Sequence, residues 1–216
     1  MRQAQHYPRG VSEQHYFTSR PTTEAAEHSH VFTIRGRKLG VTTASGVFSA
    51  DRLDKGTQVL LEHVPAPPAT GTFLDLGCGW GAIALALACE SPRATVLATD
   101  VNERALDLTV RNTEAAGCRN VRVMEASELL AELLDKGTRL DLIWSNPPVR
   151  IGKEALHRML STWLRLLADD GVAWLVVGKN LGADSLARWL TQQGYEVKRT
   201  ASSKGFRVLQ VRPLTA

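Results

Sequence analysis

The chain has 216 residues, of which 44% are hydrophobic, enough for one domain with a substantial core or one domain with a small extension. No apolar run reaches the length that spans a bilayer, and the first ten residues lack the apolar segment of a signal peptide. We therefore expect a cytoplasmic protein with no membrane contact. The three cysteines, Cys78, Cys89 and Cys118, show no C-x-x-C spacing, which predicts reduced thiols without a disulfide framework or a metal site.

The formal net charge of +4 is unevenly distributed along the chain. Residues 149–216 carry 11 Lys and Arg against 5 Asp and Glu, whereas residues 72–148 carry 7 against 11. A basic C-terminal third suits a polyanionic partner such as a nucleic acid, although an ordinary solvated surface has the same composition. Charge alone leaves the partner open.

The N-terminal part contains few regular elements. The first thirty residues are polar and weakly periodic, which predicts a loop or a loosely docked arm. Residues 31–45 alternate around Gly36-Arg37-Lys38 and predict a β-hairpin with a basic turn. Residues 58–64 predict an apolar helix with Thr57 as its N-cap, ended by a run of prolines.

A regular alternation of strands and helices fills residues 69–216, which we take as the main domain after an extension over residues 1–68. This order predicts a Rossmann-like, doubly wound α/β fold with a seven-stranded, mostly parallel sheet and one antiparallel strand from a terminal hairpin. The expected strands are 72–76, 95–100, 121–126, 140–145, 171–177, 196–202 and 206–211, and the expected helices are 82–89, 102–116, 128–135, 153–167 and 183–193.

The first of these strands runs into a glycine turn with the pattern D-x-G-x-G-x-G, formed by Asp75, Gly77, Cys78, Gly79 and Gly81. Glycines at these positions permit a sharp turn and a close approach of a ligand to the start of the next helix. The dinucleotide fingerprint G-x-G-x-x-G is one residue wider and binds a pyrophosphate, which an acid here would repel. The pattern favours a cofactor with an ammonium group, namely S-adenosylmethionine, over a nicotinamide cofactor or a turn without a ligand.

Other strand ends should line the same site, because ligands of such sheets bind at the carboxyl ends of the strands. Asp100 ends the second strand and can accept hydrogen bonds from ribose hydroxyls, or it can cap the following helix. Val101 can pack on an adenine. Ala126 and Ser127 follow the third strand and can contact the adenine through the backbone, although Ser127 can equally cap the next helix.

The fourth strand ends at Asn146, Pro147 and Pro148, which we interpret as the catalytic residues. A planar exocyclic amine is a poor nucleophile because its lone pair is delocalised. The side-chain oxygen of Asn146 and the carbonyl of Pro147 can accept the two amine hydrogens and hold the lone pair toward a methyl group, which is catalysis by positioning. The alternative is a simple turn between a strand and a helix.

With these motifs, the chain resembles the "methyltransferase small" family of class I S-adenosylmethionine-dependent methyltransferases, whose best-known members methylate the N2 amine of guanine in ribosomal RNA. The resemblance covers residues 15–213 and includes G-x-F-S at residues 46–49 and D-x-G-T at residues 54–57. It implies that Phe48 and Ser49 lie over the cofactor and the target base, and that ribosomal RNA or a ribosomal subunit is the partner.

Residues after Asn-Pro-Pro depart from that resemblance or extend it. Relatives often have an aromatic residue where this chain has Val149, so Phe48 becomes the candidate to clamp the base. Arg150, Lys153 and His157 can contact RNA phosphates, or they can be exposed charges without a partner.

Three alternatives stay open from the sequence. The acceptor can be adenine N6 or a protein glutamine amide, although the glutamine enzymes usually carry a tyrosine after Asn-Pro-Pro. The fold can also serve as a catalytically silent RNA-binding module. The target nucleotide and the oligomeric state are not encoded in any motif, and we expect a monomer.

Overall fold

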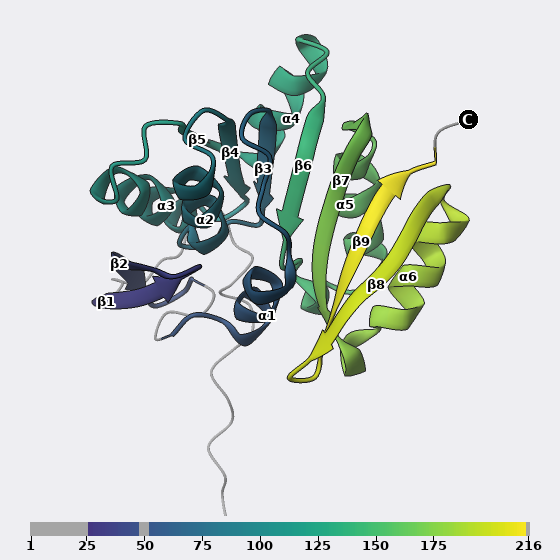
Figure 1. The fold of residues 1–216 in the computed structure, drawn as a ribbon, viewed down its shortest axis with the longest axis horizontal. Coiled ribbons are helices and arrows are strands. Elements are labelled where there is room, and N and C mark those ends of the chain that lie inside the picture. The colour runs from purple at the N-terminus through teal and green to yellow at the C-terminus, as the bar shows by residue number, and fades with distance from the viewer. Residues whose placement is uncertain (1–25, 48–51, 215–216) are drawn as a thin grey trace, which may run out of the picture.

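The computed structural model describes residues 26–47 and 52–214. Its main feature is a seven-stranded sheet with the strand order β5-β4-β3-β6-β7-β9-β8 (Figure 1). Neighbours pair in parallel from β5 to β7, and β9 runs antiparallel to both β7 and β8. The predicted Rossmann-like sheet with one antiparallel strand is confirmed. The strands are β3 (Thr72–Leu76), β4 (Thr95–Asp100), β5 (Val121–Glu125), β6 (Leu140–Ser145), β7 (Leu167–Gly178), β8 (Tyr195–Ser203) and β9 (Phe206–Pro213).

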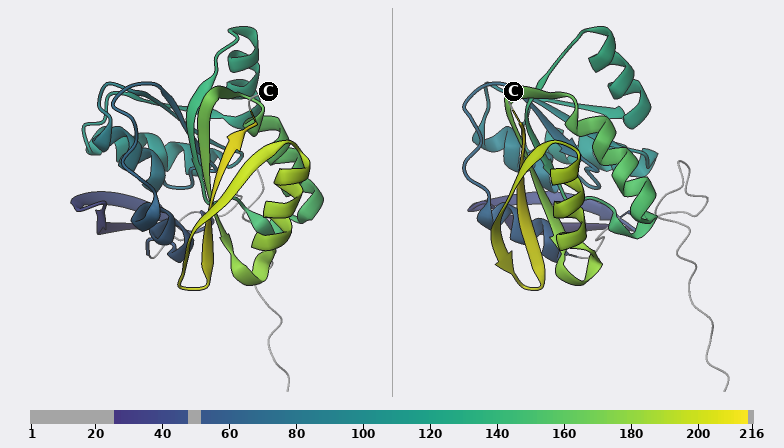
Figure 2. Two further views of the ribbon diagram at one scale, coloured as in Figure 1. Left: turned by 45° about the vertical axis from the view of Figure 1, so that its right-hand side comes forward. Right: turned by 90° about the vertical axis from the view of Figure 1, so that its right-hand side faces the viewer.

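Helices cover both faces of this sheet (Figure 2). Successive side chains of a strand point to opposite faces, so Phe73 of β3 packs into one apolar cluster and Leu74 into the other. The first cluster includes side chains of α1 (Lys55–His63), α2 (Ala82–Glu90) and α3 (Glu103–Ala115). The second includes side chains of α4 (Ala126–Asp135), α5 (Lys153–Leu164) and α6 (Ala183–Gln192). This two-sided covering explains why the strands read as nearly continuous apolar runs.

A two-stranded hairpin, β1 (Glu27–Ile34) and β2 (Arg37–Ala44), packs against α2 and α3. The side chain of Asn112 in α3 bonds to both the N–H and the carbonyl of Thr42 in β2, at 2.7 and 2.8 Å. The predicted turn lies one residue too late, because Arg37 already pairs with Ile34 and the turn consists of Arg35 and Gly36. Both turn residues have positive φ, a conformation that Gly36 adopts without strain.

Three further details differ from the prediction at helix ends. Thr57 is not the N-cap of α1: Asp54 is, and its Oδ2 accepts the N–H of Thr57 at 2.9 Å. Ser127 does not cap α4, because Glu125 does so. Helix α5 ends at Leu164 rather than at residue 167, since Leu167 already pairs with Leu140 in the sheet.

Candidate active site

The glycine turn between β3 and α2 is held by two neighbouring elements. The N–H groups of Gly77 and Cys78 both donate to the carbonyl of Thr99 in β4, at 2.9 Å each. On the other side, Thr109 of α3 donates its hydroxyl to the carbonyl of Gly79 at 3.0 Å. Gly77 and Gly79 have φ values of +80° and +56°. Apart from their chain neighbours, no atom of the described residues lies within 4 Å of the point where either would carry a Cβ. The turn is therefore fixed by its hydrogen bonds, and no described side chain fills the space beside these two glycines.

Gly81 and Cys78 face inward instead. A Cβ on Gly81 would lie 3.1 Å from the side chain of Thr109, so glycine here permits close packing of the turn on α3. The Cys78 side chain is buried and its Sγ accepts a hydrogen bond from Thr109. Burial raises the pKa of the Cys78 thiol well above its ordinary value, which makes it unreactive. Only the backbone of these two residues can serve a ligand.

Asp75 is completely buried at the penultimate position of β3. Its Oδ2 accepts the N–H of Ala84 at 2.8 Å and so caps α2, whose own N-cap is Gly81. Its Oδ1 has no hydrogen-bond partner among the residues that the structure describes. Burial, together with the nearby charge of Asp100, raises the pKa of Asp75 to about 8. A buried carboxylate oxygen without a partner fits the ammonium end of S-adenosylmethionine, which would supply the missing donor.

Asp100 lies at the end of β4 directly beside the glycine turn. Its Oδ2 accepts the N–H of Gly79 and its Oδ1 accepts the N–H of Asn102, both at 3.0 Å. The cap of α3 is Asn102, whose Oδ1 accepts the N–H of Arg104. Each carboxylate oxygen keeps acceptor capacity, so the predicted contact with ribose hydroxyls fits this position. Val101 is 47% exposed next to it, as an apolar surface for an adenine.

The end of β5 carries a carboxylate that the sequence analysis missed. Glu125 is paired in register with Asp100 on the neighbouring strand. Its carboxylate accepts both the N–H and the hydroxyl of Ser127. The hydroxyl of Ser127 is thus engaged by Glu125, while the half-buried Ala126 and the exposed Ser127 begin α4 at the same edge of the sheet.

The end of β6 lies next to the end of β3. Ser145 donates its buried hydroxyl to the carbonyl of Leu76 at 2.7 Å, which fixes the start of Asn-Pro-Pro beside the glycine turn. The Nδ2 atom of Asn146 donates to Asp54 Oδ2 at 2.7 Å and to Thr57 Oγ1 at 3.1 Å. The Pro147 carbonyl accepts the N–H of Val149 at 2.8 Å, and a carbonyl has a second lone pair available.

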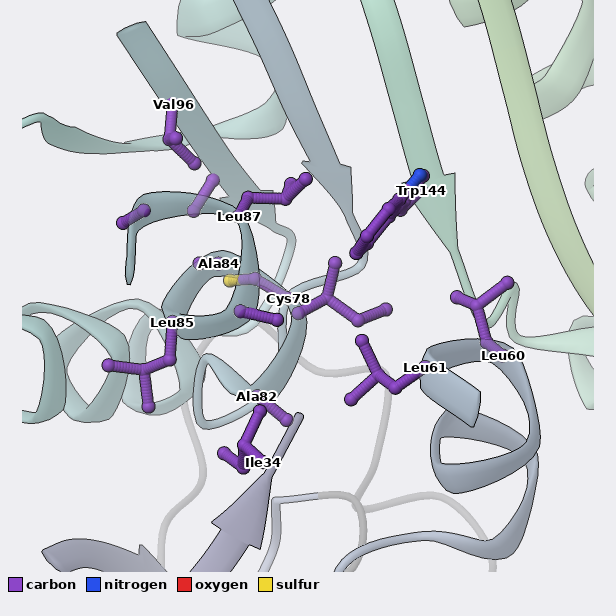
Figure 3. Close-up of a cluster of buried hydrophobic side chains, with 14 of the residues drawn as sticks. Ile34, Leu60, Leu61, Cys78, Ala82, Ala84, Leu85, Leu87, Val96 and Trp144 are labelled. Carbon is purple, nitrogen blue, oxygen red and sulfur yellow. The ribbon is translucent and has the colours of Figure 1, made fainter. Parts of the chain in front are cut away.

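Apolar side chains pack next to the polar residues of the candidate site. Trp144, the fully buried residue of β6 that pairs in register with Asp75, lies in the same cluster as Cys78 and as Leu60 and Leu61 of α1 (Figure 3). This packing connects α1, the glycine turn and β6. Asn146 therefore follows a strand whose position is set by a rigid core.

The predicted substrate residues after Asn-Pro-Pro lie in the segment that leads from β6 into α5. Val149 and Lys153 line a pocket of about 140 Å³ with His157, while the side chains of Arg150 and Lys153 are exposed. The ring of His157 stacks on Trp189 of α6 with centroids 3.7 Å apart. Burial and the charge of Lys153 lower the pKa of His157. A stacked, neutral imidazole is a poor phosphate ligand, so Arg150 and Lys153 are the better candidates.

Two predicted residues, Phe48 and Ser49, lie outside the described residues, and their assignment stays a prediction. The chain is anchored on both sides of them: Asn102 donates its Nδ2 to the carbonyl of Gly46 at 3.2 Å, and Asp54 accepts a hydrogen bond from Asn146.

Among the helices of residues 26–47 and 52–214, none combines the length and the apolar composition that a membrane span requires.

Comparisons with known proteins identify the family of the chain. The family model of the methyltransferase small domain matches residues 38–210. A Bacillus subtilis protein named YbxB, described as uncharacterized, is 32% identical over 199 residues, which is 92% of this chain and 98% of that protein.

Two ribosomal RNA methyltransferases match a shorter part. The large subunit methyltransferase G of Streptomyces coelicolor is 36% identical and the small subunit methyltransferase C of Hahella chejuensis is 41% identical, over 68% and 66% of this chain. The chain spans about two fifths of the length of these two relatives.

Among solved structures, the Thermus thermophilus 16S rRNA N2 G1207 methyltransferase RsmC, in complex with AdoMet and guanosine, has a TM-score of 0.69 at 22% identity. The match covers 90% of this chain and 52% of RsmC. At this identity the likeness supports the fold alone, whereas the family model covers most of the chain. The chain therefore belongs to the methyltransferase small domain family of S-adenosylmethionine-dependent methyltransferases.

Proposed function

We propose that this methyltransferase transfers a methyl group to the N2 amine of guanine in ribosomal RNA. The observation that carries the proposal is the position of Asn146, held at the end of β6 beside the glycine turn through the bond from Ser145 to Leu76. An amide oxygen and a prolyl carbonyl there form a pair of acceptors, which suits a planar amine with two hydrogens.

Each part of the site has a role in this reaction. When bound, S-adenosylmethionine supplies a methyl group activated by a sulfonium. Asp75 binds the ammonium end of the cofactor and Asp100 accepts from the ribose. Asn146 and Pro147 accept the amine hydrogens and direct the nitrogen lone pair. This mechanism requires no strong base beside the amine, because the proton that the nitrogen loses after transfer can go to water, and alignment with charge complementarity supplies the catalysis.

We propose RNA as the acceptor because the C-terminal third is basic and because two relatives are named as ribosomal RNA methyltransferases. Residues 149–216 carry a net excess of cations, and Arg150 and Lys153 are exposed directly after Asn-Pro-Pro, where they would contact phosphates. The names of the two ribosomal RNA methyltransferases point to the same substrate class. Since the match covers only about two fifths of those relatives, the choice of RNA rests mainly on this chain's own surface.

The experiment is methyl transfer from labelled S-adenosylmethionine to deproteinised ribosomal RNA and to isolated ribosomal subunits. We expect labelled RNA, and N2-methylguanosine in the digested nucleosides by mass spectrometry. N6-methyladenosine or a methylated glutamine in ribosomal protein would replace the guanine assignment. RNA binding without measurable cofactor binding would instead identify a silent RNA-binding module, and would overturn the proposal.

A further inference from the structure

The catalytic asparagine is bonded to a segment far away in the sequence. Asn146 Nδ2 lies 2.7 Å from Asp54 Oδ2 and 3.1 Å from Thr57 Oγ1, across 92 and 89 residues of chain. Asp54 is the N-cap of α1, and the same Oδ2 atom accepts the N–H of Thr57 at 2.9 Å. One carboxylate oxygen therefore joins the start of α1 to the end of β6.

These partners determine which way the Asn146 amide points. A carboxylate oxygen can only accept hydrogen bonds, so the atom that faces Asp54 must be the amide nitrogen and not the amide oxygen. The nitrogen carries two hydrogens, and Asp54 and Thr57 provide two acceptors. The Oδ1 atom of Asn146 then points away from α1 and is left to accept from another donor. A reversed amide would place two acceptor oxygens 2.7 Å apart, which is repulsive.

Packing leaves little room for this contact to loosen. A Cβ on Gly56, the residue between the two partners, would lie 2.9 Å from Asp54 Oδ2 and 3.2 Å from Asn146 Nδ2. It would also lie 3.0 Å from the ring of Phe206, the first residue of β9. Glycine at this position allows the aspartate, the amide and the phenyl ring to meet.

We propose that Asp54 and Thr57 are positioning residues that hold the Asn146 amide in the orientation needed to accept the target amine. This proposal rests on the proposed amine transfer, but it concerns a property of the free protein. The carboxylate also polarises the amide, because hydrogen bonds in a chain strengthen one another, and this makes Asn146 Oδ1 a better acceptor. Both residues would act through Asn146.

Three variants separate orientation from helix capping. Asp54→Ser keeps a capping oxygen for α1 but is too short to reach Asn146. Asp54→Asn keeps an oxygen at the same place and can serve both bonds. Thr57→Val removes the hydroxyl acceptor and keeps the backbone N–H that Asp54 binds. Thermal unfolding of each variant, and its affinity for S-adenosylmethionine, report whether the fold and the cofactor site are intact.

We expect kcat to fall by about 10²-fold in Asp54→Ser, the scale of a small misplacement of a reacting group, with cofactor affinity unchanged. Asp54→Asn should recover most of that loss, and Thr57→Val should lie between. A wild-type kcat in Asp54→Ser would overturn the proposal. An Asp54→Asn variant as slow as Asp54→Ser would also overturn the proposal, because both hydrogen bonds would then be present without restoring the rate.

A second measurement needs no turnover. In protein labelled with ¹⁵N-asparagine, the side-chain NH₂ signals of Asn146, assigned by their loss in Asn146→Ala, should be protected from exchange with water. The protection should disappear in Asp54→Ser and persist in Asp54→Asn. Unprotected signals in the wild-type protein would refute the orientation even if methyl transfer occurs. If the wild-type protein transfers no methyl group to RNA, the proposed function fails, and these signals still decide the orientation.

Discussion

Binding of S-adenosylmethionine should release a proton, because the carboxyl group assigned to its ammonium end is mostly protonated in the free protein. Burial raises the pKa of Asp75 from an ordinary 3.8 to about 8. At pH 7 roughly nine in ten molecules therefore carry a protonated Asp75. A cation next to the unpartnered Oδ1 favours the ionised form, so the proton must leave as the ligand binds.

The size of the pH effect on cofactor affinity follows from the pKa of about 8 for Asp75. Well below pH 8, the ionised fraction rises tenfold for each pH unit, so the cofactor affinity should rise about tenfold between pH 6 and pH 7, or roughly 1.4 kcal/mol. Near pH 7 about 0.9 proton should leave for each ligand bound. This range avoids the titration of the ligand's own amino group, which is expected near pH 8.

Titration calorimetry in two buffers with different ionisation enthalpies measures this proton directly. Asp75→Asn should bind S-adenosylmethionine more weakly and release no proton, because an amide does not ionise. Its side-chain oxygen can still accept the N–H of Ala84, so the cap of α2 is kept. Burial also raises the pKa of Asp100, so Asp100→Asn is the control. Proton release should persist in this variant, reduced to the extent that the charge of Asp100 raises the pKa of Asp75. Proton release that survives in Asp75→Asn, or an affinity that is flat between pH 6 and pH 7, would refute the assignment of Asp75.

Three further outcomes are expected. Asn146→Ala should bind S-adenosylmethionine about as well as the wild type by calorimetry, with kcat on RNA lowered about 10²-fold; full activity would remove the proposed mechanism. Gly56→Ala should unfold at a lower temperature and transfer more slowly, because its Cβ would lie 2.9 Å from Asp54 Oδ2; helix propensity alone predicts a gain of about 1 kcal/mol, so a raised melting temperature would contradict the contact. Asp75→Asn should be more stable than the wild type at pH 9 and similar at pH 4, because a pKa raised on folding contributes stability that is lost as pH rises through about 8. Thermal unfolding at the two pH values checks this, and the opposite order would contradict the burial of an ionisable Asp75.

The sheet was predictable because each strand and helix has a local signal. Apolar runs that end at glycines or prolines predicted where each strand stops. Because ligands bind at the carboxyl ends of the strands, this order predicted that Asp75, Asp100 and Asn146 share one edge of the sheet. Helix caps were harder, because Asp54 and Thr57 are both good capping residues three positions apart, and only the geometry chooses between them. Ser127 and Glu125 pose the same ambiguity at the start of α4.

The contact between Asp54 and Asn146 had no signal in either segment alone. It depends on how α1 packs on β6 through Trp144 and on the absence of a side chain at Gly56. The position of the Phe206 ring beside Gly56 had no sequence signal either, because α1 and β9 are far apart in the chain. Such long-range contacts are decided by tertiary packing, which periodicity and propensity do not encode.

Gly46 and Asp54 attach the N-terminal part of the chain to the ends of two different strands. One is bound to Asn102 after β4 and the other to Asn146 after β6, on opposite sides of the glycine turn. The described residues before β3 are therefore joined to the same edge of the sheet as the candidate site. A substitution in this N-terminal part can change the geometry of the site without contacting a ligand.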